Sequence, residues 1–195
     1  MVGKAHINRF AKQSSGDKRV ITADADIPDI VNTILMGDKE SRAFAFDFAN
    51  RLKGRTVRDT LKNIWGFTKN NVDYVRDNPG SEVVKSAART LKDKFGDCKS
   101  MSILNGAIMY HLGIPYKYRV SFYDEEKEQG HIYPIAMVNG QEIFVDSVVD
   151  YFDYQVTPAF YTDYYPSGKS LSGISQNNNW LAPVAIIGLM LWLQN

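Results

Sequence analysis

Residues 96–115 read GDCKSMSILNGAIMYHLGIP, and this stretch decides how the rest of the chain is interpreted. Asp97 is a preferred N-cap residue, and apolar side chains follow it at helical spacing as far as Gly113. The stretch therefore predicts a helix that begins at Asp97 and carries Cys98 in its first turn. A helix N-terminus stabilises a thiolate, and Lys99 adds a nearby positive charge. Cys98 is thus a candidate nucleophile, although a lone cysteine at the start of an apolar helix is more often a core residue.

The composition narrows the class of protein. The chain has 195 residues, of which 44% are hydrophobic and 23% charged, so one globular domain is expected rather than a disordered chain. A net charge of +1 does not favour a nucleic-acid binder that relies on a large basic surface. One cysteine and three dispersed histidines offer neither an intramolecular disulfide nor a zinc-binding pattern, so no cofactor and no metal are predicted.

Four further segments upstream show apolar residues at helical spacing. The first of them meets a stop signal at Gly37, and the third begins with Thr56 and Asp59 at capping-box spacing. Helices are therefore expected over residues 26–37, 39–52, 56–69 and 86–95, with a short extended piece over residues 72–75.

The apolar pattern changes after Pro115 from a helical to a strand-like one. Strands are expected over residues 116–123, 131–138 and 141–148, and the Asn139-Gly140 pair between the last two is a strong hairpin signal. Helices followed by strands predict an α+β fold with N-terminal helices and then an antiparallel sheet. The aromatic-rich residues 151–165 are expected to form a strap across this sheet.

The hairpin gives Cys98 two candidate partners. If residues 139–140 form the loop, Val138 lies opposite Gln141, and His131 and Asp146 become diagonal neighbours on one face of the sheet. A carboxylate beside an imidazole fixes its tautomer and stabilises its charged form. The register thus predicts a base with an orienting carboxylate, whereas a slip of one residue would move Asp146 to the other face.

Other residues compete less well for these two roles. Asp150 is the alternative orienter. His111 lies at the far end of the predicted Cys98 helix, about 20 Å from the thiol at roughly 1.5 Å per residue. His6 falls in a polar N-terminal arm.

Four features in this order and spacing resemble the core of transglutaminase-like proteins in the papain-like superfamily. They are residues 96–100, residues 112–115, His131 and the hairpin end at residues 144–146. The resemblance covers roughly residues 56–150. A closer likeness is to transglutaminase-like proteins encoded by phages and mobile elements of Bacteroidetes-type bacteria, through residues 87–90 and the aromatic residues 151–154.

The resemblance implies that Cys98 is the nucleophile, His131 the general base and Asp146 the orienter of acyl transfer through a thioester. It also implies that the backbone N–H of Cys98 is one oxyanion donor. Such sites take the second donor from a side chain upstream of the cysteine. Residues 83–97 offer no clear equivalent, so Asn71 and Trp65 are the candidates.

The two ends of the chain differ from its middle. Residues 1–20 form a basic arm without a signal peptide, and residues 21–166 the transglutaminase-like domain. A polar linker over residues 167–179 and a hydrophobic C-terminal segment over residues 180–195 follow. The apolar run of this segment is shorter than the approximately 20 residues that a bilayer crossing needs. It is expected either to enter a membrane or contact a hydrophobic partner, or to pack on the domain.

The favoured interpretation is a cysteine-dependent acyl-transfer enzyme that acts on a protein or peptide, in a phage virion or the host cytoplasm, with membrane association through residues 180–195. The alternative is a structural or assembly protein of a phage particle, which keeps the fold without using the site and is attached to a membrane or virion protein by residues 180–195. A third interpretation is a membrane-tethered module whose cleft binds a peptide.

Overall fold

The computed structural model describes residues 18–21, 27–42, 48–78, 82–124, 130–166 and 170–174. Most of the predicted basic arm, including His6, and the whole hydrophobic segment 180–195 lie outside these residues. Among the residues that the structure describes, no helix combines the length and the apolar character that a bilayer crossing requires.

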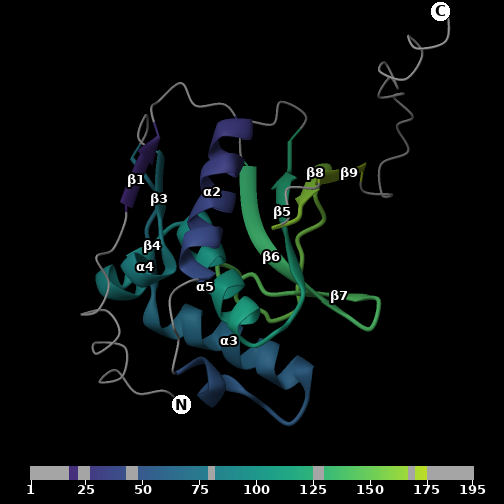
Figure 1. Cartoon of the computed structure of the whole chain (residues 1–195). Coiled ribbons are helices and arrows are strands. Elements are labelled where there is room, and N and C mark those ends of the chain that lie inside the picture. Colours follow the sequence, from purple (N-terminus) through teal and green to yellow (C-terminus); the bar gives the residue numbers. More distant parts are fainter. Residues whose placement is uncertain are drawn as a thin grey trace, which may run out of the picture.

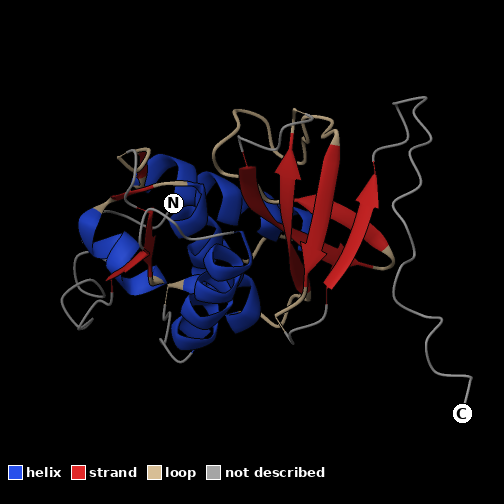
Figure 2. Ribbon diagram, turned by 90° about the horizontal axis from the view of Figure 1, so that it is seen from above, coloured by secondary structure: helices blue, strands red, loops and turns tan. Residues whose placement is uncertain are grey.

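The described chain separates into a helical part and a sheet (Figure 2). The helical part contains α2 (Ile27–Arg42), the short 3-10 helix η1 (Ala49–Leu52), α3 (Val57–Asn71), α4 (Ala87–Asp93) and α5 (Cys98–His111). The sheet is antiparallel, with the spatial order β7 (Gln141–Phe144), β6 (Gly130–Val138), β5 (Tyr116–Phe122), β8 (Phe160–Tyr164) and β9 (Ser170–Ile174). Two small sheets accompany the helices, one of β1 (Lys18–Ile21) with β3 (Glu82–Lys85), the other of β2 (Asp73–Tyr74) with β4 (Phe95–Gly96). The predicted α+β class, with helices followed by an antiparallel sheet, is confirmed.

Helix α5 lies at the centre of the fold (Figure 1). It contacts α2, α3 and α4 on the helical side and β6 on the sheet side, so every residue from Lys99 to Met109 is buried. A helix that is apolar all round is stable only in such surroundings. Helix α5 is therefore the central element of the core, and Cys98 is its first residue.

The prediction that Gly37 ends the first helix is wrong, because α2 continues through it to Arg42. A Cβ atom at Gly37 would lie 3.1 Å from Cδ1 of Ile103 on α5, so the glycine allows close packing of two helices. The helix expected over residues 39–52 is wrong for the same reason. Its first residues belong to α2, and η1 is the helical element that the structure describes near its end.

The later helices follow the prediction more closely. Both hydrogen bonds of the capping box form between Thr56 and Asp59 at the start of α3. Helix α4 ends at Asp93 rather than at residue 95, since Lys94 adopts a left-handed φ of 62°. Phe95–Gly96 is therefore extended and pairs in parallel with β2, which places Tyr74 opposite Gly96.

The predicted hairpin and its register are confirmed. Asn139 and Gly140 have φ values of 51° and 80°, as a two-residue loop of the mirror-image type requires, and Val138 pairs with Gln141. Strand β7 ends at Phe144, however, four residues earlier than the strand expected over residues 141–148. The segment after Val145 packs on helices instead of on β6, as described below.

Two segments that were assigned to a strap and a linker contribute strands. Residues 160–164 of the aromatic segment form β8, which pairs with β5, and Ser170–Ile174 from the predicted linker forms β9 beside β8. Both strands supply hydrogen-bond partners for a sheet edge that would otherwise be open.

Candidate active site

Cys98 is the first residue of α5, and Asp97 caps this helix as predicted. The Oδ1 atom of Asp97 accepts a hydrogen bond from the backbone N–H of Ser100 at 3.0 Å. The thiol is free and partly exposed, and it lines a cavity of about 710 Å³. His131, the second residue of β6, lines the same cavity.

His131 is bound to Asp146 as expected, although the strand pairing ends before Asp146. Its Nε2 atom lies 2.6 Å from Oδ2 of Asp146, and the other carboxylate oxygen accepts the backbone N–H of Val148 at 3.0 Å. Burial opposes the charged imidazole, but the hydrogen bonds with Asp146 and then Cys98 outweigh it and raise the pKa of His131 to about 10. The ring therefore carries a positive charge at neutral pH.

The ring of His131 is shared between two partners. Because Asp146 occupies Nε2, the hydrogen bond with the Cys98 side chain is left to Nδ1. The structure thus brings Cys98, His131 and Asp146 together in the order that the sequence analysis expected. An imidazolium beside a thiol favours the thiolate form, which is the nucleophilic one.

Side chains of α3 and α5 hold the loop that carries Asp146, and the sequence analysis missed this. The indole Nε1 of Trp65 donates to the backbone oxygen of Asp146 at 2.8 Å. Asn105 donates from its amide to the backbone oxygen of Val145 at 2.9 Å and to the hydroxyl of Ser147 at 2.8 Å. An asparagine within an apolar helix was the signal in the sequence, since a buried amide requires partners.

A hydrogen bond from α3 orients the side chain of Asn105. Asn105 is 1% exposed, and its Oδ1 atom accepts the hydroxyl of Thr68 on α3 at 2.6 Å. The loop therefore leaves the strand register after Val145 because the half-buried Trp65 and the buried Asn105 bind it. The contact between His131 and Asp146 depends on this packing and not on continued strand pairing.

Lys99 places a positive charge near Cys98, as predicted, but carboxylates share this charge. Its ammonium forms ion pairs with Asp77 at 3.2 Å, with Glu82 at 2.6 Å and with Asp97. Burial opposes its charged form, but the attraction of Asp97 outweighs this and raises the pKa of Lys99. Three carboxylates therefore offset the charge of Lys99, and His131 is the cation that contacts the Cys98 side chain.

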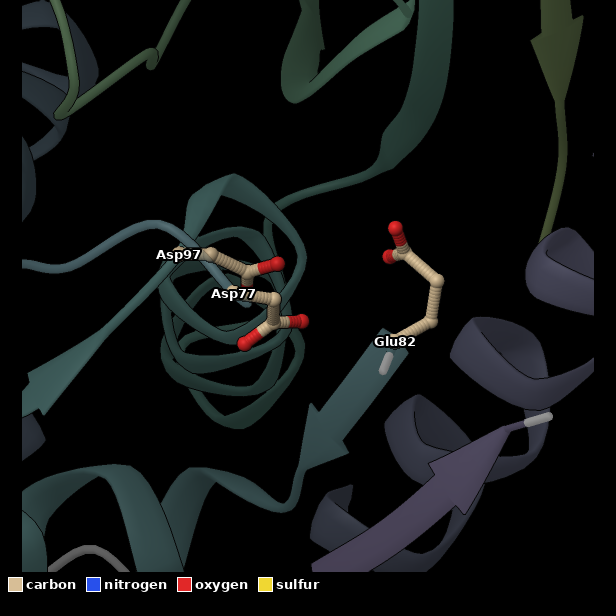
Figure 3. Close-up of side chains that lie close together, drawn as sticks. All are labelled: Asp77, Glu82 and Asp97. Atoms are coloured by element: carbon tan, nitrogen blue, oxygen red, sulfur yellow. The ribbon is translucent and has the colours of Figure 1, made fainter. Parts of the chain in front are cut away.

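The same three carboxylates are the group in the described part of the chain whose spacing suits a metal ion (Figure 3). One oxygen from each of Asp77, Glu82 and Asp97 lies within 4.8 Å of the others. The ammonium of Lys99 already neutralises part of their charge, and Asp97 also caps α5. The cluster is therefore an internal ion pair network that ties the start of α5 to β3.

The remaining sequence candidates take other roles. Asp150 is exposed and pairs with Lys69 at 2.9 Å, so it does not orient His131. His111 is exposed at the last position of α5. The suggested second oxyanion donors do not line the cavity: the indole N–H of Trp65 is donated to the backbone oxygen of Asp146, and an amide N–H of Asn71 to that of Phe67.

Tyr74 is a residue of this site that the sequence analysis passed over. Its pairing with Gly96 brings it next to the start of α5, and it lines the same cavity as Cys98. Burial raises the pKa of Tyr74, and the charges of Cys98 and Asp97 add to the effect. Its hydroxyl is thus protonated at neutral pH and able to donate a hydrogen bond in the cavity.

Comparison with known proteins gives a family match and several structural neighbours. Residues 42–182, well over half of the chain, match the model of the transglutaminase-like superfamily. A protein from Cytophaga hutchinsonii, provisionally named a cysteine protease, is 21% identical with a TM-score of 0.42, over 67% of this chain and 48% of its own. A protein from Parabacteroides distasonis, provisionally named a protease, is 14% identical with a TM-score of 0.43, over 88% of this chain and 31% of its own. This chain therefore spans less than half the length of either neighbour, and no curated protein sequence matches it.

Proposed function

This chain belongs to the transglutaminase-like superfamily, and from that premise we propose that it is a cysteine-dependent acyl-transfer enzyme. One observation carries the proposal: the Cys98 thiol and the His131 ring face one cavity, with His131 bound to Asp146 at 2.6 Å. The substrate class is an amide of a protein or peptide, and the intermediate is a thioester on Cys98.

In the proposed reaction the Cys98 side chain is the nucleophile, and the imidazolium of His131 is the acid. The Cys98 thiolate attacks the amide carbon, so a C–S bond forms and an electron pair moves to the carbonyl oxygen. The C–N bond then breaks as His131 donates its proton to the leaving amine. In the second half, water or an amine gives a proton to His131 and attacks the thioester, which releases the acyl product and restores the thiolate.

Two donors stabilise the negative oxygen of the intermediate in this scheme. The backbone N–H of Cys98 is one, since the first N–H groups of a helix have no partner within it. The hydroxyl of Tyr74 is the other, because it lies in the same cavity and the two donors suggested by the sequence are occupied. Asp146 holds the Nε2 side of the imidazole, so that Nδ1 faces the thiol.

The test uses p-nitrophenyl acetate, an activated ester, and iodoacetamide. We expect a burst of p-nitrophenol that disappears in Cys98→Ala, and alkylation of Cys98 at pH 6 much faster than that of a free cysteine peptide. Alkylation no faster than that of the free thiol would rule out an activated nucleophile. Fluorescent amine incorporated into casein, set against casein hydrolysis, then separates transfer from hydrolysis.

A second candidate is a structural or assembly protein of a phage particle in which the site is unused. The hydrogen bonds of Trp65 and Asn71 favour this candidate, because Tyr74 is then the one side chain proposed as an oxyanion donor beside the backbone N–H of Cys98. This candidate predicts that Cys98→Ala leaves particle assembly and infectivity intact, whereas removal of residues 180–195 abolishes them. The reverse pattern would exclude it.

The location and partners are part of the same proposal. We propose a protein that acts in a phage virion or the host cytoplasm and contacts a membrane or virion protein through residues 180–195. The support is the sequence, in which no charged side chain follows Lys169. Co-sedimentation with liposomes, with and without residues 180–195, measures the membrane contact directly.

A further inference from the structure

The cavity that contains Cys98 and His131 has an apolar side formed largely by α2. Four of its residues, Ile27, Ile30, Val31 and Ile34, recur at helical spacing along the cavity. Strands β5 and β6 complete this side with Val120, Phe122 and Ile132. Figure 1 shows α2 standing beside the sheet, next to the start of α5.

The accessible part of this apolar side is small and well defined. Val31 and Ile34 are buried in the core, whereas Ile27 is 37% exposed and Ile30 is partly exposed. The charged residues of the cavity come from elements other than α2, and among them the ammonium of Lys99 is bound to carboxylates. A ligand that reaches Ile27 and Ile30 therefore meets apolar side chains.

The far end of α2 is anchored, so the apolar side is preformed. Asp38 is fully buried and accepts the hydroxyls of Tyr116 at 2.5 Å and Tyr118 at 2.7 Å, while Arg42 forms an ion pair with it. Gly37 allows the close approach of α5 described above. A helix held in this way keeps its other residues at fixed positions beside the sheet.

Helix α2 is also outside the part of the chain that defines the family. The match begins at residue 42, which is the last residue of α2. The α2 side of the cavity therefore precedes the matched region, while it lines the same cavity as the nucleophile.

The occupant of this part of the cavity is fixed by its continuity with Cys98. Acyl transfer requires the reacting carbonyl at the thiol, so the neighbouring volume receives the next part of the same substrate. We propose that α2 forms a specificity pocket that takes a bulky apolar side chain next to the reacting carbonyl. This inference rests on the proposed function and names the substrate class: amides with a leucine-like or phenylalanine-like group beside the reacting carbonyl.

The test compares two electrophiles of equal chemistry, N-methyl chloroacetamide and N-benzyl chloroacetamide. Each reacts by forming an S–C bond to Cys98 while the C–Cl bond breaks and chloride leaves. The measured quantity is the ratio of the second-order rate constants, benzyl over methyl, divided by the same ratio for a free cysteine peptide. Burial of part of a phenyl ring predicts a corrected ratio of about ten or more in the intact protein.

Substitutions in α2 test whether its residues cause the preference for the benzyl reagent. Ile30→Ala and Ile27→Ser should lower the corrected ratio toward one, and both positions are partly exposed, so the variants are expected to fold. Met36→Ala is the matched control, since Met36 lies on α2 with 51% exposure and does not line the cavity. This control should keep the ratio of the parent protein.

The outcomes separate this proposal from the proposed function. A corrected ratio near one, with Cys98 still much more reactive than the free thiol, overturns the specificity pocket alone. A high ratio that persists in both isoleucine variants overturns the role of α2. Slow reaction of Cys98 with both reagents overturns the proposed function, and with it this inference.

Discussion

The Nε2 atom of His131 lies 2.6 Å from Oδ2 of Asp146, although His131 belongs to a strand and Asp146 to a loop. The loop is held by Trp65 of α3 and Asn105 of α5. Helix α5 thus contributes twice to the site: its first residue is Cys98, and its buried Asn105 fixes the residues on either side of Asp146.

The charge of His131 depends on Asp146, so Asp146→Asn should change the pH dependence of Cys98 alkylation. In the parent protein we expect fast alkylation to rely on the imidazolium up to a pH near 10, the value to which the pKa of His131 is raised. A neutral amide cannot replace the carboxylate in stabilising the imidazolium of His131. The midpoint of the pH dependence should therefore move toward the ordinary histidine pKa of about 6.5. An NMR titration of His131 gives the same midpoint, and an unchanged midpoint would contradict the role assigned to Asp146.

The same raised pKa affects folding stability. A group whose pKa is higher in the folded than in the unfolded state stabilises the fold below its unfolded pKa and loses this contribution as the pH rises through the folded pKa. The contribution of His131 should therefore be full below pH 6.5 and lost by about pH 10. Urea unfolding of the parent protein and of His131→Gln across this range measures it as a difference that shrinks with rising pH.

Asn105→Ala should loosen the Asp146 loop. The substitution leaves Thr68 without its acceptor and the backbone oxygen of Val145 without a donor, which costs about 2–4 kcal/mol of unfolding free energy. The midpoint of the Cys98 alkylation profile should also fall, since His131 loses its fixed partner. Asn63→Ala is the control: it removes one hydrogen bond to Leu52 near the surface and should cost under about 1 kcal/mol with no change in the profile.

Tyr74→Phe should separate acylation from alkylation. Loss of an oxyanion donor lowers the rate of thioester formation from p-nitrophenyl acetate by roughly 100-fold. Alkylation has no oxyanion, so its rate should stay within about twofold. Tyr154→Phe changes an exposed tyrosine and should affect neither rate; equal losses in both reactions would mean that Tyr74 acts on Cys98 itself.

Asp38→Ala should destabilise the attachment of α2. It leaves two buried tyrosine hydroxyls and Arg42 without their acceptor, for which we expect a loss of about 3–5 kcal/mol in urea unfolding. Asp29→Ala, in the exposed first turn of the same helix, should cost under about 1 kcal/mol. A small effect of Asp38→Ala would mean that α2 is held mainly by its apolar contacts.

A divalent cation should bind the three carboxylates around Lys99 only in a variant that lacks the lysine ammonium. In the parent protein the ammonium already pairs with Asp77, Glu82 and Asp97, so millimolar calcium should leave the melting temperature unchanged. Lys99→Ala leaves three carboxylates facing one another and should lower the melting temperature. Calcium should then restore part of the loss, and a calcium response of the parent protein would contradict this description of the cluster.

Elements with strong local signals could be predicted from the amino-acid sequence alone. Asp97 capped α5, Thr56 and Asp59 formed their capping box, and Asn139-Gly140 set the register from which the approach of His131 to Asp146 was inferred. Each of these depends on residues within a few positions of one another, where backbone geometry leaves few alternatives.

Features that join residues distant in the sequence depend on the folded structure and could not be predicted. Gly37 was expected to end a helix, but it lies where α2 packs closely against α5. The segment around Gly37 does not show which distant residue will pack against it. Lys99 carries the positive charge expected near Cys98, but its pairing with Asp77 and Glu82 from outside the helix is a feature of the folded structure. Asn105, Tyr74 and the apolar side formed by α2 entered the site in the same way, because burial and long-range pairing, rather than local propensity, place them around Cys98.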